Sequence, residues 1–334
     1  MSRASCLLLL PLLVGLSACF DVDGFVFGGV PCSTVGPDTC EEIEIEWDRA
    51  CLPCEARYDW GEAFPWEAWF PRMLADGRTI RPIDGSIDGG AVVRTVVPTD
   101  DGLGELDTYF VPAHGEDASR AQTTVFYNHG NYIGVEHYVP RVRVLHELGF
   151  NVFIWDYRGY GKSLPTAPPT DLQFLDDARQ MRAFVSTLAP DPDRIVAYGY
   201  SLGSIPAVEA SVADPGCALL LESPFTGAAG ILRDGGLAWP ESYLSGGRYH
   251  NAAKIRAYEG PLFVMVGEDD GFFSPETIRP IYENAPTAAK EFWVLPGVDH
   301  GVSTGGVPED GLTQYDDRIR AFLEANAPAC LTAD

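Results

Sequence analysis

The chain has 334 residues, 46% of them hydrophobic, which is enough for one large hydrophobic core or two smaller ones. Its 48 acidic and 23 basic residues give a formal net charge of -25 at pH 7. A surface with this charge repels phosphate backbones, so we expect no nucleic-acid partner and interpret the acidic excess as a solubility feature.

The first residues are typical of a signal peptide. Arg3 precedes an apolar run over 6–16 that is too short to span a bilayer. The run ends in Leu16-Ser17-Ala18-Cys19, which resembles the lipobox of bacterial lipoproteins, in which the cysteine is acylated. We therefore expect 1–18 to be a lipoprotein signal peptide and Cys19 the lipidation site. The mature protein is then exported and anchored to a membrane, facing the periplasm or the cell surface. An ordinary secretory signal is the alternative.

Six cysteines remain once Cys6 of the signal peptide and Cys19 are set aside, and an even number in an exported chain favours disulfides. The six candidates are Cys32, Cys40, Cys51, Cys54, Cys217 and Cys330. The sequence leaves the connectivity open. Our hypothesis is a Cys217–Cys330 bridge with two more bridges among the other four. Cys51 and Cys54 also have the spacing of a redox or zinc half-site, but no thioredoxin-like pattern surrounds them, and Cys32 and Cys40 lack zinc-ligand spacing. We expect no metal.

Residues 19–60 show no clear period and are interpreted as a tether with a cysteine-rich segment, which leaves 61–334 as the main domain. Within that domain, 91–97 and 106–111 alternate as two antiparallel strands joined by a turn. Strands and helices then alternate along the chain. The expected strands are 123–127, 151–155, 194–198, 217–221, 261–266 and 291–295, and the expected helices are 135–148, 171–188, 202–213, 275–284 and 313–326. Such alternation predicts a mostly parallel central sheet with helices on both faces.

One short motif suggests a nucleophile. The stretch Gly199-Tyr200-Ser201-Leu202-Gly203 follows the strand 194–198 and precedes a helix. A sharp strand-to-helix turn exposes the serine oxygen and crowds its neighbours, which the two glycines relieve. The first turn of the helix also directs its N–H groups at the site. The context therefore predicts that Ser201 is a nucleophile.

A serine nucleophile needs a base, and the base needs a carboxylate. Among six histidines, only His300 lies in a loop directly after a late strand. Asp270 follows the strand 261–266, and Asp269 is the rival acid. The order serine, acid, histidine, with acid and base after successive strands, is the order this fold class requires. We prefer Asp270 because of its spacing from Gly267 and from the helix-starting Pro275.

The tetrahedral intermediate of acyl transfer needs two donors for its oxyanion. We expect the N–H of Leu202, directly after the nucleophile, to be one. The other is expected from the loop after 123–127, where Asn128-His129-Gly130-Asn131 turns the chain so that the Asn131 N–H faces the site. We interpret His129 as a structural residue of that loop.

Six segments occur in order: NHGN, WDYRGYGKS, GYSLGS, LLESPFT, GEDDGFFSPE and PGVDHG. Together they resemble the α/β-hydrolase superfamily, near its serine aminopeptidase-like branch and the related membrane-associated hydrolases that include protein depalmitoylases. The resemblance covers roughly 90–326. It implies an α/β-hydrolase fold, a triad of Ser201, Asp270 and His300, and an oxyanion hole at Asn131 and Leu202. It also implies a short lid at about 224–258, which suits small or single-chain acyl substrates.

The chemistry expected of these residues is acyl transfer to water on a small-molecule acyl substrate, without a cofactor. The triad itself does not separate esters, thioesters and amides. We rank carboxylic esters first. The alternatives are a serine peptidase of the aminopeptidase-like kind, deacylation of lipidated substrates, and a non-catalytic lipoprotein binding module on a hydrolase fold. A redox module at Cys51 and Cys54 is a further alternative.

Overall fold

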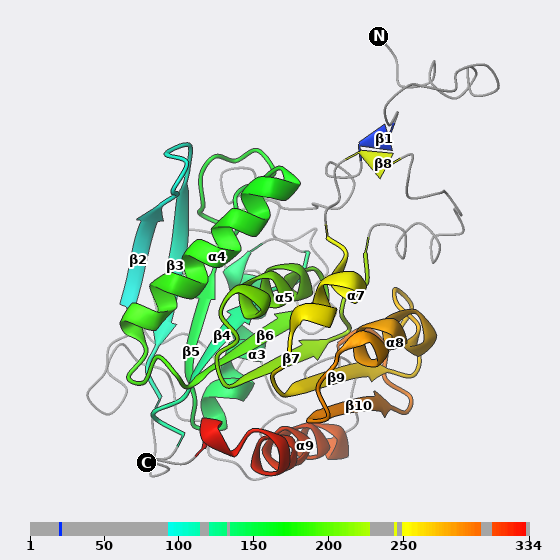
Figure 1. Ribbon diagram of the computed structural model, residues 1–334. Coiled ribbons are helices and arrows are strands. Elements are labelled where there is room, and N and C mark those ends of the chain that lie inside the picture. Colours follow the sequence, from blue (N-terminus) through cyan, green and yellow to red (C-terminus); the bar gives the residue numbers. More distant parts are fainter. Residues whose placement is uncertain are drawn as a thin grey trace, which may run out of the picture.

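The chain folds around one large sheet. The computed structural model describes residues 20–21, 93–113, 120–131, 134–227, 244–245, 249–301 and 309–331. The strands of the sheet are β2 (Val93–Pro98), β3 (Glu105–Val111), β4 (Thr124–Asn128), β5 (Asn151–Trp155), β6 (Ile195–Tyr200), β7 (Ala218–Glu222), β9 (Leu262–Gly267) and β10 (Lys290–Leu295). Their order is β10-β9-β7-β6-β4-β5-β3-β2 (Figure 1). β2 and β3 are antiparallel to their neighbours, and the other pairs are parallel.

Helices cover both faces of this sheet (Figure 1). They are α3 (Val135–Glu147), α4 (Asp171–Leu188), α5 (Ser204–Ala213), α7 (Asn251–Lys254), α8 (Pro275–Asn284) and α9 (Glu309–Asn326), with the 3-10 turns η3 (Ser201–Gly203), η5 (Ile255–Ala257) and η6 (Pro328–Cys330). Side chains of α3 and α9 share one core cluster, and those of α4, α5, η5 and α8 share the other. Away from the sheet, β1 (Phe20–Asp21) and β8 (Leu244–Ser245) form a parallel pair.

The central strands are buried on both faces, and their side chains alternate between the two cores. On β5, Val152 and Ile154 join the cluster with α3 and α9, whereas Phe153 and Trp155 join the cluster with α4 and α5. This alternation follows from the two-residue repeat of a strand. It explains why these strands are continuous apolar runs in the sequence.

The α/β-hydrolase fold class expected from the sequence is confirmed. β5, α4 and α8 have the expected bounds, and most other elements differ by one or two residues. One of the two-residue differences lies at the glycine-serine-glycine motif. There β6 continues to Tyr200 and a 3-10 turn intervenes, so α5 begins at Ser204 rather than at 202. α9 begins at Glu309, four residues before the expected start at 313. The short helix α7 was not expected.

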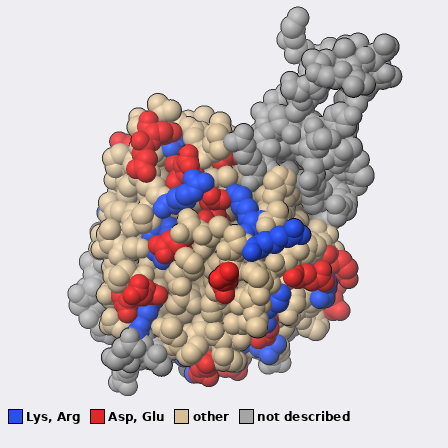
Figure 2. All heavy atoms as spheres, viewed as in Figure 1, with Lys and Arg blue, Asp and Glu red and all other residues tan. Residues whose placement is uncertain are grey.

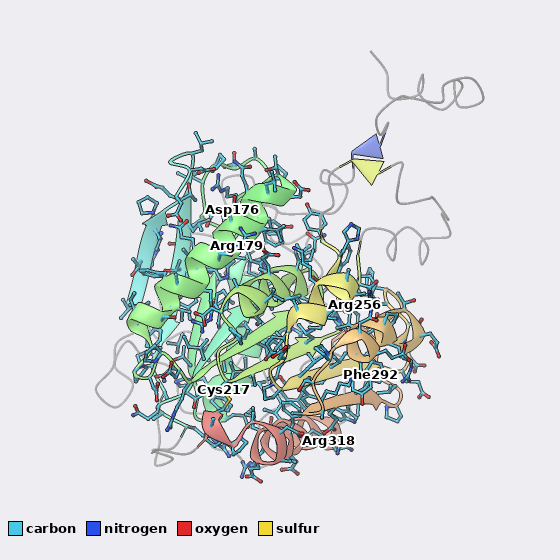
Figure 3. The ribbon with its side chains drawn as sticks, viewed as in Figure 1. Asp176, Arg179, Cys217, Arg256, Phe292 and Arg318 are labelled. Atoms are coloured by element: carbon cyan, nitrogen blue, oxygen red, sulfur yellow. A yellow bond between two sulfur atoms is a disulfide. The ribbon has the colours of Figure 1, made fainter. Side chains whose placement is uncertain are left out.

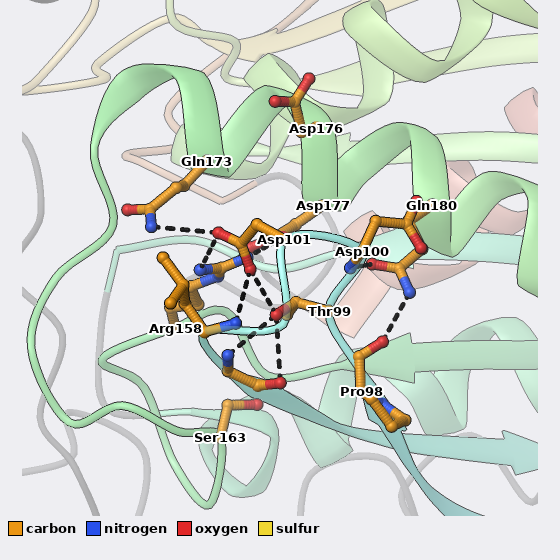
Figure 4. Close-up of polar contacts among 12 residues, drawn as sticks. Pro98, Thr99, Asp100, Asp101, Arg158, Ser163, Gln173, Asp176, Asp177 and Gln180 are labelled. Carbon is orange, nitrogen blue, oxygen red and sulfur yellow. Dashed lines mark hydrogen bonds and ion pairs between the residues drawn. The ribbon is translucent and has the colours of Figure 1, made fainter.

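A buried arginine ties the first hairpin to the rest of the domain. Arg158, 2% exposed, donates two hydrogen bonds to Asp177 of α4, each at 2.8 Å. It also donates to both oxygens of Asp101 in the β2–β3 turn, at 2.8 and 3.0 Å (Figure 4). Gln180 of α4 adds a hydrogen bond to the carbonyl of Pro98 at the end of β2. These contacts fasten the antiparallel edge of the sheet to the helix layer.

The predicted Cys217–Cys330 bridge is present, with a Cα–Cα distance of 5.5 Å. Cys217 precedes β7 and lies near the C-terminal turn η6, as Figure 3 shows. Cys19, Cys32, Cys40, Cys51 and Cys54 lie outside the described residues, as do 1–18, nearly all of 19–60 and most of the expected lid. The predictions about these segments stay predictions.

Charged side chains are interspersed on the face shown in Figure 2, where acidic and basic groups alternate over the helix layer. Arg179 of α4 illustrates this pattern, because it pairs with Asp176 on its own helix and with Glu209 on α5. Glu209 in turn pairs with Lys254 of α7. Within the described residues, none of the helices combines the length and apolar character that crossing a membrane requires.

Candidate active site

Ser201 lies at the carboxyl end of β6, in a sharp turn between strand and helix. Its φ angle is +51°, which is uncommon for a residue with a side chain and stores strain of about 1–3 kcal/mol. The positions two residues before and after the serine have to be glycine, because a Cβ at either one would clash with backbone atoms. A Cβ on Gly203 would lie 2.0 Å from the carbonyl oxygen of Asn128, and one on Gly199 would lie 2.6 Å from the carbonyl oxygen of Gly203. The turn therefore packs directly on the loop after β4.

His300 and Asp270 lie beside this serine, on the loops after the adjacent strands β10 and β9. The Oγ of Ser201 is 3.0 Å from Nε2 of His300. The other ring nitrogen, Nδ1, is 2.9 and 3.0 Å from the two carboxylate oxygens of Asp270. With the proton on Nδ1, the ring donates to Asp270 and accepts from Ser201. The structure thus brings the three predicted residues into one hydrogen-bonded chain.

The carboxylate of Asp270 is held ionised by its surroundings. It is 8% exposed, and burial alone would raise its pKa. Hydrogen bonds from His300 and from the N–H groups of Phe273 and Phe272 outweigh burial and lower the pKa below its ordinary value. A buried anion at this point stabilises a positive charge on His300.

The rival carboxylate, Asp269, is exposed and does not contact the histidine ring in the described structure. Its backbone N–H donates to the carbonyl of Val298, which joins the acid loop to the histidine loop. Asp299 strengthens this junction, because its Oδ1 accepts from the N–H of Gly271 at 2.9 Å and of His300 at 2.7 Å. These hydrogen bonds therefore hold the two loops together.

The expected oxyanion residues lie on two segments in contact. Leu202 is buried within η3, and Asn131 follows the β4 loop that packs on Gly203. The side chain of Asn131 accepts a 2.5 Å hydrogen bond from the hydroxyl of Tyr160. His129 is fully buried and stacks on Tyr157 with ring centroids 4.0 Å apart, as expected of a structural histidine. The assignment of the Asn131 and Leu202 N–H groups to an oxyanion stays a prediction.

A buried polar cluster beneath the site was missed by the sequence analysis. Arg141 of α3 donates to Glu222 at the end of β7 at 2.8 Å, and the hydroxyl of Tyr198 donates to the other oxygen of Glu222 at 2.5 Å. The guanidinium lies 3.6 Å from the ring centroid of Tyr200, the residue before the nucleophile. Burial raises the pKa of Tyr200 to about 12, so its hydroxyl stays neutral.

One signal for this cluster was present in the sequence: a glutamate ending the run Ala218-Leu219-Leu220-Leu221, directly beside the strand that carries the nucleophile. A buried carboxylate in such a place requires a cation, which Arg141 supplies. Arg141 lies 81 residues earlier in the chain, so the pairing itself had no local signal.

Three aromatic rings surround the imidazole of His300. The centroid distances are 4.8 Å to Phe272, 5.3 Å to Tyr200 and 5.6 Å to Phe273. Phe273 and Tyr200 are buried, whereas Phe272 is 66% exposed. Within the described part of the chain, no group of three or more His, Cys, Asp or Glu side chains is placed to hold a metal ion.

This fold is also found in known proteins. The family model described as "Serine aminopeptidase, S33" matches residues 119–238. The uncharacterized protein YfhR of Escherichia coli is 35% identical over 203 residues, which are 58% of this chain and 69% of that protein. The alpha/beta hydrolase domain-containing protein aho-3 of Caenorhabditis elegans is 27% identical over 213 residues, 62% of this chain. The chain belongs to the α/β-hydrolase superfamily.

Among solved structures, an esterase of Pyrococcus furiosus, Pf2001, has the same fold, with a TM-score of 0.55 and 20% identity. The match covers 75% of this chain and 97% of that structure. The chain spans 63% of the length of two Mycobacterium tuberculosis relatives and 59% of aho-3.

Proposed function

We propose that this protein is a serine hydrolase that cleaves carboxylic esters of small-molecule acyl substrates through an acyl-enzyme. The observation that carries the proposal is the hydrogen-bonded chain from Ser201 through His300 to Asp270, with heavy-atom distances of 3.0 and 2.9 Å. Nucleophile, base and orienting acid each lie at the carboxyl end of a parallel strand, where open α/β sheets place their sites.

The proposed reaction has two halves. In the first, Ser201 Oγ attacks the ester carbonyl carbon while His300 Nε2 takes the serine proton. The bond between that carbon and the alcohol oxygen then breaks, and His300 gives its proton to the leaving alcohol. In the second half, His300 deprotonates a water molecule that attacks the acyl-enzyme, and the proton returns to Ser201 as the acid leaves. Asp270 keeps the imidazole in the required tautomer throughout.

The ester assignment is supported by the fold likeness to the Pf2001 esterase, and the peptidase alternative by the description of the matching family model. Both reactions use the same three side chains, so the substrate has to be separated by experiment. The exposed apolar ring of Phe272 beside His300 favours an uncharged, apolar substrate over a peptide amino terminus.

The test is hydrolysis of p-nitrophenyl esters, from acetate to palmitate, by the purified full chain. We expect turnover by the wild type and a loss of at least about a thousandfold in kcat for Ser201→Ala. The matched control is Ser211→Ala in α5, whose hydroxyl is buried and has no hydrogen-bond partner within the described residues. That variant should keep wild-type activity.

Two other outcomes have distinct meanings. Release of p-nitroaniline from amino-acid anilides, without ester turnover, would identify the peptidase. A folded wild type that hydrolyses neither kind of substrate, and whose Ser201 is not labelled by a fluorophosphonate, would identify the non-catalytic module. Deacylation of lipidated substrates would be indicated by a steep preference for the longest acyl chains in the ester series.

We also propose that the protein is an exported lipoprotein anchored through Cys19. The Cys217–Cys330 disulfide supports export, because such bridges persist in oxidising compartments. Radiolabelled palmitate fed to a bacterial host should label the wild type and Cys32→Ser but not Cys19→Ala. Labelling of Cys19→Ala would contradict the anchor.

A thiol count on the unfolded, unreduced protein tests the redox module, which requires two free thiols at Cys51 and Cys54.

A further inference from the structure

Phe272 is a large aromatic side chain that folding leaves in solvent. It is 66% exposed, although its neighbour Phe273 is 9% exposed and packs on Phe225 with ring centroids 6.1 Å apart. The other large exposed hydrophobic side chains of the described residues are aliphatic and lie on β2, the turn after it, the loop after β5 and the first turn of α4. Phe272 instead lies against His300, with ring centroids 4.8 Å apart.

The backbone holds this ring in a fixed place. The N–H groups of Phe272 and Phe273 both donate to Asp270 Oδ1 at 2.9 Å. The N–H of Gly271 donates to Asp299 at 2.9 Å, and Ser274 caps α8 immediately afterwards. The turn that presents Phe272 is therefore fastened to the acid, to the histidine loop and to a helix. An apolar ring that stays exposed contributes little to the stability of the fold, because water still surrounds it. Burial of this ring against a substrate would release that water and favour binding.

The position of the ring relative to His300 indicates which part of a substrate it meets. In the proposed reaction the alcohol oxygen receives its proton from His300 Nε2, so it has to lie about 3 Å from that atom. An exposed ring whose centroid lies 4.8 Å from that of the imidazole is therefore within reach of a group attached to the alcohol oxygen. The carbonyl oxygen is directed instead at N–H donors of the serine turn and the β4 loop.

We propose that Phe272 is a specificity-determining residue that forms the apolar wall for the leaving group, and that the substrates are esters of apolar alcohols. This inference rests on the proposed ester hydrolysis and adds the substrate class. Phe272 takes no part in proton transfer. It binds the alkyl or aryl group beyond the alcohol oxygen, while Tyr200 and Phe273 support the imidazole from buried positions.

The test uses two isomeric esters, hexyl acetate and methyl heptanoate, which place the same alkyl length on the alcohol side or on the acyl side. Hydrolysis by the full chain is followed by titration of the released acid. For Phe272→Ala we expect kcat/KM to fall about tenfold on hexyl acetate, through KM, and under about twofold on methyl heptanoate. Phe272→Leu, which keeps an apolar side chain, should retain most of the activity on hexyl acetate.

Two controls separate this inference from the proposed function. Leu172→Ala removes a 48% exposed side chain from α4 and should leave both esters unaffected. Labelling of Ser201 by a fluorophosphonate, whose leaving group is fluoride, should be unchanged in Phe272→Ala. Equal losses on both esters, or a larger loss on methyl heptanoate, would overturn the inference and leave ester hydrolysis intact. No turnover of either ester by the wild type would overturn both.

Discussion

Adjacent carboxylates have different environments in this site. Asp270 is 8% exposed, and its carboxylate accepts hydrogen bonds from three donors, the ring N–H of His300 and the backbone N–H groups of Phe272 and Phe273. Asp269 is exposed and contributes its backbone N–H to the contact between the two loops. A carboxylate that accepts several N–H bonds is pre-organised for its task, whereas a solvated one is not.

This difference predicts a sharp contrast between two substitutions. Asp270→Asn should lower kcat by about 10⁴, because an amide at this position favours the wrong tautomer of His300. Asp269→Asn should change kcat by less than about threefold. Initial rates on p-nitrophenyl acetate would measure both. Comparable losses in the two variants would mean that the acid had been assigned to the wrong residue.

At the residue scale, the sequence predicted what depends on local geometry. The nucleophile motif and the order of serine, acid and histidine were visible because each follows its own strand. The cluster of Arg141, Glu222 and Tyr198 was not visible, because its members come from α3, β7 and β6 and meet only in the folded chain. The sequence does not predict that Phe272 is exposed, because its exposure depends on the hydrogen bonds that hold the turn after Asp270.

Secondary-structure elements were predictable where their pattern was long. The helix α4 begins with a full capping box, in which the side chains of Thr170 and Gln173 satisfy each other's backbone N–H groups, and its bounds were predicted correctly. The helix α7 has four residues and no periodicity to detect. It is fixed by tertiary contacts, since Asn251 donates to the carbonyl of Phe225 and to the hydroxyl of Ser204.

The connection between α4 and the β2–β3 turn contains more negative than positive charge. Arg158 lies between Asp101 and Asp177, so one cation neutralises two carboxylates. Burial raises the pKa of Asp177 to about 6, and the hydrogen bonds from Arg158 only partly oppose this. Hydrogen bonds from Arg158 and Thr99 lower the pKa of Asp101 well below its ordinary value. Asp177 is therefore the carboxylate that takes up a proton first.

This arrangement predicts that acidification stabilises the folded chain, because protonation relieves the cost of burying the charge of Asp177. The pKa of Asp177 is about 6 in the folded chain against an ordinary value of 3.8, so the folded state binds the proton more tightly. The stabilisation is absent above about pH 6 and complete below 3.8. Between pH 7 and pH 5, the free energy of unfolding should gain about 1 kcal/mol from this group.

Urea unfolding at pH 7 and pH 5 would measure this gain as a difference between variants. Asp177→Asn, which cannot titrate, should lack it. Asp176→Asn changes the exposed carboxylate one residue earlier on α4 and should keep it. If the wild type and Asp177→Asn showed the same pH dependence, the carboxylate would be ionised throughout this range and the charge argument would be wrong.

For the whole molecule, the disulfide and the active site lie at opposite ends of the strands. Cys217 immediately precedes β7, and Cys330 follows α9 within η6. The serine, acid and histidine all follow the carboxyl ends of β6, β9 and β10. The carbonyl of Cys330 also accepts a hydrogen bond from Thr123 at the start of β4. The bridge therefore fastens the C-terminal helix to the end of the sheet remote from catalysis.

Removing this bridge should lower stability without changing the chemistry. The bridge spans 113 residues of sequence, and closing so long a loop restricts the unfolded chain strongly, so Cys217→Ala with Cys330→Ala should reduce the free energy of unfolding by about 2–5 kcal/mol. Initial ester hydrolysis rates below the unfolding transition should stay at the wild-type level.

Reductant separates this bridge from those predicted among Cys32, Cys40, Cys51 and Cys54. If those bridges also stabilise the fold, reductant will lower the stability of the double variant further. If they do not, reductant will bring the wild type to the double variant's value and leave the variant unchanged. Lost activity in the folded double variant would contradict this prediction. It would mean that the bridge holds the triad in place from the opposite end of the strands.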